Sequence, residues 1–137
     1  MTEGKRDDIL SLPPGAGRRY AMGRLTATFK ADGAETGERY SASEWRLDPG
    51  QPGVGAHRHE TNDEIFLVLE GCPELLLGES WTACPAGTFL RIPAGVLHDF
   101  RNAGTEPARF FSMFLGDGFE RNMPSIVEWF AAREPPV

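Results

Sequence analysis

The stretch HRHETNDEIFLVLEG, residues 57–71, joins two histidines and an acidic segment to an apolar run that a glycine closes. His57 and His59 are two residues apart, so on a strand both side chains would point to the same side. A strand that simply continued would give Glu64 the opposite parity, but the intervening ETND offers a turn or bulge that resets the register. The stretch is therefore either a polar surface loop or the rim of a site where two imidazoles and a carboxylate converge.

Glycine and proline punctuate the whole chain at short intervals. The 137 residues include 16 glycines and 11 prolines, in turn-like runs such as LPPGAG, DPGQPG and CPAG rather than in one linker. Such punctuation between short apolar or alternating segments is typical of an antiparallel sandwich or barrel. We therefore expect a single all-β domain over residues 1–137. The expected strands are Tyr20–Lys30, Tyr40–Leu47, Gly55–His59, Glu64–Glu70, Glu74–Leu77, Trp81–Cys84, Thr88–Ile92, Leu97–Asn102 and Ala108–Leu115.

The C-terminal stretch SIVEWFAAR has a helical pattern instead. Ser125 and Glu128 have the spacing of a capping box, and the following EPP ends the pattern. We expect one short helix over about residues 125–133, packed against the barrel. Its apolar residues fall on one face: Ile126, Val127, Trp129 and Phe130.

Composition excludes several classes of partner. A formal net charge of −6 with no basic patch makes nucleic acid an unfavourable partner, and no apolar run is long enough to span a membrane. The opening MTEGKRDDILSL lacks an apolar stretch of signal-peptide length, so we expect a cytoplasmic protein. Cys72 and Cys84 are too few for a disulfide scaffold, and a hairpin turn at Gly78 would put Pro73, not Cys72, opposite Cys84. Both thiols are expected to be reduced.

The chain contains three histidines in all, His57, His59 and His98. An isolated H-x-H is usually just a pair of polar residues on an exposed strand. If His98 joins the pair from a neighbouring strand and Glu64 turns inward, the set is three imidazoles and one carboxylate oxygen. This set suits one divalent transition metal, namely iron, manganese, nickel, copper, cobalt or zinc, and does not suit calcium. The sequence does not choose among these ions.

The spacing around the histidines closely resembles the two signature motifs of the cupin superfamily. The first motif, over about residues 50–71, reads H-x-H, four residues, Glu64, six residues and Gly71. The second, over residues 87–102, reads G, five residues, PAG, two residues, His98, three residues and Asn102. One position departs from the pattern, because Gln51 stands where the family has a leading glycine. Within that superfamily the chain resembles small single-domain bacterial cupins of the quercetinase-like or cupin_2 type.

The resemblance implies an antiparallel jelly-roll β-barrel whose lumen holds the metal on His57, His59, Glu64 and His98. Positive φ angles at Gly71 and at the glycine that opens the second motif would end and begin strands. Asn102 is expected to brace the backbone rather than to touch substrate. Acidic neighbours of Glu64 are expected to stay at the surface.

Four protein ligands leave one or two positions open on an ion that prefers five or six, which permits Lewis-acid or redox chemistry. Glu64 could also act as a catalytic base toward a substrate hydroxyl. The resemblance implies a metal-dependent oxidoreductase of the dioxygenase type acting on a small aromatic or enol-bearing molecule. Two alternatives stay open, a metal-dependent isomerase or lyase and a non-catalytic small-molecule-binding cupin, because the fold does not select a reaction.

The strand EIFLVL divides its side chains between two environments. If Glu64 faces the metal, Phe66 and Val68 follow it inward, and the aliphatic residues that alternate with them point out of the barrel. An outward stripe formed by Ile65, Leu67 and Leu69 needs a cover, either an N-terminal strand or a second subunit, so we expect a homodimer. The expected wall of the substrate pocket is Phe66, Phe100 and Met113, with Phe110 or Phe111 as a further member.

Overall fold

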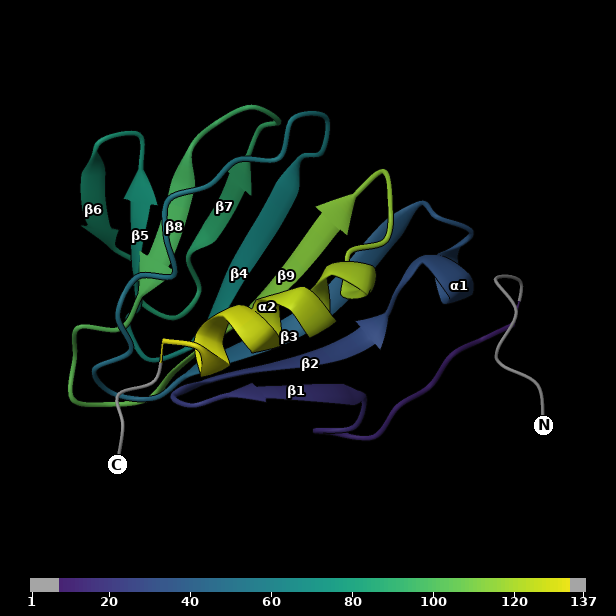
Figure 1. Cartoon of the computed structure of the whole chain (residues 1–137), viewed down its shortest axis with the longest axis horizontal. Helices are drawn as coiled ribbons and strands as arrows, with labels where there is room; N and C mark the ends of the chain where they lie inside the picture. Colours follow the sequence, from purple (N-terminus) through teal and green to yellow (C-terminus); the bar gives the residue numbers. More distant parts are fainter. Residues whose placement is uncertain (1–7, 134–137) are drawn as a thin grey trace.

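The computed structural model describes residues 8–133. Within this range the chain forms nine strands in two sheets, and every strand pair is antiparallel (Figure 1). The larger sheet has the order β1-β2-β3-β9-β4-β7 and the smaller one the order β6-β5-β8. The strands are β1 (Arg18–Met22), β2 (Leu25–Ala31), β3 (Tyr40–Leu47), β4 (Glu64–Glu70), β5 (Glu74–Leu77), β6 (Ser80–Ala83), β7 (Phe89–Ile92), β8 (His98–Arg101) and β9 (Ala108–Leu115).

The hydrophobic core lies between the inner faces of the two sheets. Strand β9 shows the alternation clearly, because every second residue from Ala108 to Phe114 is buried and the residues between these are only partly buried. Phe66 of β4 and Leu75 of β5 meet in this core from the two sheets. The expected all-β jelly roll is therefore confirmed, in an open form, since no strand ladder joins the two sheets within residues 8–133.

Two expected strands are not found as such in the structure, and the bounds of β6, β7 and β8 differ from the expected ones by one residue at one or both ends. The segment Tyr20–Lys30 is not one strand but a hairpin, because Gly23 adopts a φ of 68° and reverses the chain between β1 and β2. The segment Gly55–His59 is not a strand either, since only His57 forms an isolated bridge, to His98. Gly55, with a φ of 107°, lies outside the strand region of backbone space, which explains why no ladder forms there.

Three short helices accompany the sheets. Helix α1 (Gly33–Thr36) was not expected, and Glu35 caps it by accepting a hydrogen bond from the Asp32 backbone nitrogen at 2.8 Å. After β9 come a 3₁₀ turn, η1 (Glu120–Asn122), and helix α2 (Met123–Ala131). Helix α2 begins two residues before the expected start, with a proline in its first turn, so the expected capping box at Ser125 is wrong. No helix within residues 8–133 is long and apolar enough to cross a lipid bilayer.

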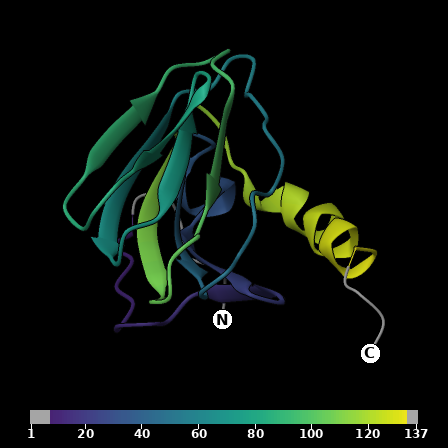
Figure 2. The ribbon, with the colours of Figure 1, turned by 90° about the vertical axis from the view of Figure 1, so that its left-hand side faces the viewer.

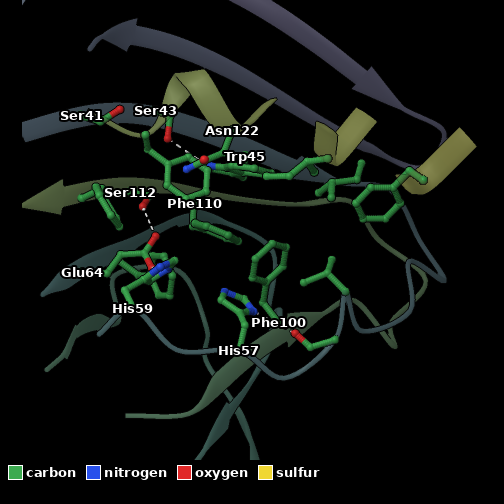
Figure 3. A pocket seen from close by; sticks show the side chains of 18 of the residues that line it. Ser41, Ser43, Trp45, His57, His59, Glu64, Phe100, Phe110, Ser112 and Asn122 are labelled. Carbon is green, nitrogen blue, oxygen red and sulfur yellow. Dashed lines mark hydrogen bonds and ion pairs between the residues drawn. The ribbon is translucent and has the colours of Figure 1, made fainter. Parts of the chain in front are cut away.

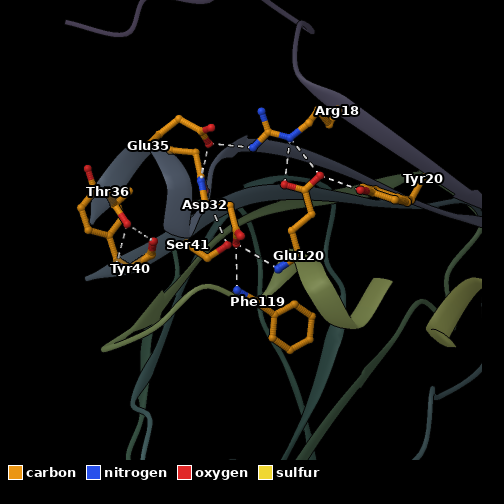
Figure 4. Close-up of polar contacts among 10 residues, drawn as sticks. Arg18, Tyr20, Asp32, Glu35, Thr36, Tyr40, Ser41, Phe119 and Glu120 are labelled. Atoms are coloured by element: carbon orange, nitrogen blue, oxygen red, sulfur yellow. Dashed lines mark hydrogen bonds and ion pairs between the residues drawn. The ribbon is translucent and has the colours of Figure 1, made fainter. Parts of the chain in front are cut away.

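A polar cluster ties the beginning of α2 to the first hairpin (Figure 4). Asp32 accepts hydrogen bonds from the backbone nitrogens of Phe119 and Glu120 at 2.8 and 2.9 Å. The Glu120 carboxylate in turn accepts from Arg18 at 2.8 Å and from the Tyr20 hydroxyl at 2.6 Å. Burial raises the pKa of Tyr20 to about 12, with help from this bond to Glu120. The cluster holds α2 to one side of the two sheets, as Figure 2 shows.

The motif residues without ligand roles hold turns and strand ends. Gly71 has a φ of 73°, and a Cβ there would lie 2.3 Å from the Pro107 carbonyl oxygen, so only glycine fits without a shift. Asn102 is buried, donates to the Leu47 carbonyl at 3.1 Å and accepts from the Gly104 nitrogen at 3.0 Å, which confirms its bracing role.

Two further expectations agree with the structure: the glycine turn at Gly50 and Gln51, and the hairpin register beside the two cysteines. At the departure from the motif, Gly50 takes the positive φ of 83° and Gln51 is buried beside it. Cys72 and Cys84 are unbridged, and the Cys84 nitrogen donates to the Pro73 carbonyl at 2.9 Å, as the expected hairpin register requires.

Candidate metal centre

The three histidines meet between the two sheets. Their ring nitrogens offer one ligand atom each, and these atoms all lie within 4.8 Å of one another. A pair of backbone hydrogen bonds, from His57 to His98 at 2.9 Å and back at 2.8 Å, sets the two imidazoles side by side with ring centroids 4.4 Å apart. His59 completes the cluster at 5.3 and 5.5 Å from the other two rings. The expected convergence is thus present, although the His57–His59 segment is a loop.

Backbone carbonyls orient two of the three rings. The Nδ1 atom of His57 lies 2.8 Å from the Gly55 carbonyl oxygen, and that of His98 lies 3.0 Å from the Val96 carbonyl oxygen. A carbonyl oxygen can only accept, so Nδ1 carries a proton in both rings, and Nε2 is the atom left to bind a metal or, for His98 without a metal, a proton donated to Glu64. The neutral form of both rings is thereby the tautomer that a metal ligand needs.

Glu64 stands at the start of β4 and points to the same place. Its Oε1 atom lies 3.2 Å from His98 Nε2 and 3.3 Å from His59 Nε2. Two ligand atoms that share one ion at about 2.1 Å each would be about 3.0–3.4 Å apart, so these spacings fit a common ion. Ser112 Oγ donates to the other carboxylate oxygen, Oε2, at 2.9 Å and fixes the rotamer. The three imidazoles in this arrangement could hold a first-row divalent ion, and the Glu64 carboxylate lies beside two of them.

The charges of the cluster favour a cation. Burial raises the pKa of Glu64, but the hydrogen bonds to His59 and His98 outweigh burial and bring this pKa down to about 2. Burial lowers the pKa of His57, and the neighbouring His98 adds to the shift. For His98, burial also lowers the pKa, but its contacts with Glu64 and the Val96 carbonyl outweigh burial and raise it. An anionic carboxylate therefore faces imidazoles at neutral pH.

A cavity of about 490 Å³ opens from the histidines toward α2 (Figure 3). Among the residues that line it, none is lysine or arginine, and Glu64 is the one acid. Apart from Glu64 and two of the histidines, the polar side chains in its lining are Ser41, Ser43, Ser112 and Asn122. Much of its wall is aromatic, with Trp45, Phe66, Phe100, Phe110, Phe114, Phe119, Trp129 and Phe130.

Some of the residues expected in the pocket wall line the cavity, and others do not. Phe66 and Phe100 line the cavity, and so does Phe110. Met113 does not, because it lies on the outer face of β9, paired across the sheet with Ile65 of β4 and Ala42 of β3. Phe111 points to that outer face as well.

Reasoning from the sequence missed the contribution of β3 and α2 to the cavity. Ser41, Ser43 and Trp45 alternate inward along β3, and all three are buried. Their period-two spacing in YSASEWRL was a readable signal. Trp129 and Phe130 of α2 close the far side, where α2 packs against the core through Ile126 and Val127 and the preceding Phe119 nitrogen is bound by Asp32.

Comparison with known proteins places the chain among described families. Quercetin 2,3-dioxygenase of Bacillus subtilis (strain 168) is 37% identical over 92 residues, which are 66% of this chain and 26% of that protein. Mannose-1-phosphate guanylyltransferase 2 of Escherichia coli O157:H7 is 28% identical over 88 residues, 64% of this chain and 18% of that protein. The chain thus spans about a quarter or less of the length of these curated relatives.

Solved structures with the same fold cover most of this chain. KdgF from Halomonas sp. superposes with a TM-score of 0.64 at 15% identity, over 75% of this chain and 89% of that one. The polyketide cyclase RemF from Streptomyces resistomycificus gives 0.62 at 21% identity, over 86% and 81%. At these identities the likeness shows the fold alone. The family model described as Cupin_2, Cupin domain, matches residues 43–114, more than half of the sequence, and this chain therefore belongs to the cupin family.

Proposed function

We propose that this protein is a metal-dependent oxidoreductase of the dioxygenase type that acts on a small aromatic or enol-bearing molecule. In this proposal His57, His59, His98 and Glu64 hold the ion. The observation that carries it is the cavity itself, in which an aromatic wall without any lysine or arginine adjoins three imidazoles and a carboxylate. The likeness to quercetin 2,3-dioxygenase supports the same class of reaction.

The lining residues argue against strongly anionic substrates. Phosphate and multiple carboxylate groups are usually bound by arginine or lysine, and the cavity wall has neither. A sugar phosphate isomerase is among the proteins that share this fold, and so is a predicted oxalate decarboxylase. Their substrates would meet phenyl and indole rings here instead of cations. A flat, weakly charged molecule suits such walls, because aromatic faces favour stacked or edge-to-face contacts.

A bound first-row ion would supply Lewis-acid and, with iron, manganese, nickel or copper, redox chemistry. Side chains of the protein would transfer the proton, exclude water and position the substrate. When Glu64 is not bound to the ion, its Oε1 can take the proton of a substrate hydroxyl, while Ser112 holds Oε2 and keeps the carboxylate in place. Phe66 and Phe100 keep water from the neighbourhood of the histidines and position the ring of the substrate. Dioxygenation puts both atoms of O₂ into the product and needs no external reductant.

The proposal is tested by loading metal-free protein with each candidate ion and measuring oxygen uptake with a flavonol, a catechol and an enediol. We expect uptake with at least one ion and, with ¹⁸O₂, two labelled atoms in the product. His98→Ala should abolish uptake, whereas Glu60→Ala, which removes an exposed carboxylate from the same loop, should not. Conversion without oxygen would instead establish an isomerase or lyase. Saturable binding with no conversion by any loaded form would establish a binding protein.

We also propose that the protein is a homodimer. Leu67 on β4 and Phe89 on β7 are cross-strand partners on the outer face of the larger sheet, and they are 37% and 62% exposed. Leu69 on the same face is also 37% exposed. A contiguous apolar face of this kind favours association with a second copy. Sedimentation of the wild type and of Leu67→Glu tests this: a dimer that becomes a monomer supports the proposal, and a monomeric wild type contradicts it.

A further inference from the structure

A row of polar side chains crosses the inner face of the larger sheet at the level of the histidines. Ser43 on β3 is the direct cross-strand partner of Ser112 on β9. Ser112 in turn donates from Oγ to the Oε2 atom of Glu64 on β4 at 2.9 Å. Figure 3 shows this row running from the metal-ligand cluster toward Ser43 along the cavity wall. It is the polar path across an otherwise aromatic surface.

The two serine hydroxyls of the row have different partners. The Ser112 proton is used by Glu64. The Ser43 oxygen accepts a hydrogen bond from Trp45 Nε1 at 2.9 Å, which occupies a lone pair and leaves the hydroxyl proton of Ser43 without a protein acceptor among residues 8–133. Ser43 is only 5% exposed and lines the cavity. A hydroxyl proton in an apolar cavity is stabilised by an acceptor, so this group is suited to a ligand oxygen.

The register of the sheet sets the distance between the two ends of the row. Strand β9 lies between β4 and β3, and Glu64 pairs with Phe114 of β9 whereas Ser43 pairs with Ser112, so the two ends are separated by two strand spacings and by two residues along the strands. At about 4.8 Å for each spacing and about 3.4 Å for each residue, their backbones are roughly 12 Å apart. The Glu64 side chain reaches back to Ser112, so its carboxylate and the Ser43 hydroxyl both lie beside Ser112 in the cavity wall.

Aromatic side chains border the row on both sides. Trp45 is the cross-strand partner of Phe110, and the Phe110 ring lies 4.9 Å from that of Phe66, which forms one border. Phe114, next to Glu64 in the register, forms the other. A planar molecule lying along the row would therefore contact rings along its edges or faces while its two ends meet polar groups.

We propose that Ser43 is a specificity-determining residue that donates a hydrogen bond to a carbonyl or ether oxygen at the end of the substrate remote from the metal. The substrate class that follows is a planar aromatic molecule with hydroxyl oxygens at one end and an acceptor oxygen at the other. This inference rests on the proposed function, because it places the hydroxyl end of the substrate at the histidines.

A purely structural role for Ser43, as the partner of Trp45, predicts a different outcome, and two probes separate the two roles. Esculetin is a two-ring catechol with a carbonyl at the far end, and 2,3-dihydroxynaphthalene is a two-ring catechol without one. Their binding to zinc-loaded protein is measured by calorimetry, since zinc has no redox chemistry and no turnover interferes. The variants are Ser43→Ala and the control Ser80→Ala, which removes an exposed serine hydroxyl from β6, away from the residues that line the cavity.

We expect Ser43→Ala to weaken esculetin binding about five- to tenfold, which is the effect of losing one hydrogen bond. The same variant should change 2,3-dihydroxynaphthalene binding less than about twofold, because that probe has no acceptor for Ser43. Ser80→Ala should leave both unchanged. An equal loss for both probes in Ser43→Ala, or no loss for either, overturns the inference and leaves the proposed function intact. If the zinc-loaded wild type binds neither probe, the inference and the aromatic substrate of the proposed function fail together.

Discussion

Metal should stabilise this fold, and the size of the effect can be worked out for His98. A ligand that binds only the folded state at about a hundred times its dissociation constant stabilises that state by about 2.7 kcal/mol. Unfolding entropy near 60 °C is about 2.1 cal/mol/K per residue, which for 137 residues is about 0.29 kcal/mol/K. The expected rise in melting temperature is therefore about 9 °C for the wild type. His98→Ala removes the most buried ligand, so this rise should disappear.

The assay is thermal unfolding of chelator-treated protein with and without added zinc, followed by circular dichroism, with metal content measured in parallel. His98 is 1% exposed, and its truncation also lowers the melting temperature of the metal-free protein. The quantity compared is therefore the change in melting temperature that zinc causes within each variant. The lower melting temperature of the metal-free variant does not affect this difference. Glu60→Ala is the control and should keep the full shift. An equal shift in the wild type and His98→Ala, or a wild type that neither shifts nor retains zinc, would refute a metal site at these histidines.

Three further outcomes are expected. Glu64→Ala should keep about half or more of the zinc-induced shift, since three imidazoles remain, and should lose oxygen uptake if the carboxylate serves as base; metal content and uptake check this. Burial raises the pKa of Asp32, but backbone hydrogen bonds outweigh burial and lower it below its usual 3.8, so its contribution is present above about pH 4 and is lost as the pH falls through the folded value. Acid unfolding of Asp32→Asn should accordingly be less steep below about pH 4 than that of the wild type. Gly71→Ala should destabilise by more than Gly78→Ala in urea unfolding, because both have positive φ, worth about 1 kcal/mol, but a Cβ meets a carbonyl oxygen at 2.3 Å only at Gly71.

Three of the longer strands could be predicted from the sequence to the residue. The bounds of Tyr40–Leu47, Glu64–Glu70 and Ala108–Leu115 agree with the structure, because each is an apolar or alternating segment bounded by turn or polar residues. The inward turn of Glu64 was predicted from the polar residues before it. The convergence of the three histidines was predicted because they follow a recognisable spacing.

Other features depend on contacts between distant residues, and no local pattern contains them. The loop before His57 is held by Asp99, whose carboxylate accepts hydrogen bonds from the nitrogens of Val54 and Gly55 at 2.9 and 3.2 Å. Nothing within residues 53–59 indicates that partner, so a strand was expected there. Met113 was misplaced for a related reason, since RFFSMFL is apolar on both faces and its parity is fixed only by the pairing of Ser112 with Ser43.

The same pairing decides what the cavity can recognise. Because side chains alternate along β9, a slip of one residue would replace Ser112 with Phe111 at the centre of the row. Glu64 would then lose the donor to Oε2, and Ser43 would face a phenyl ring in place of a hydroxyl. The metal-ligand geometry and the polar path to Ser43 therefore depend on one strand register. A substitution on the inner face of β9 should alter metal affinity and substrate preference together, whereas one on its outer face should alter neither.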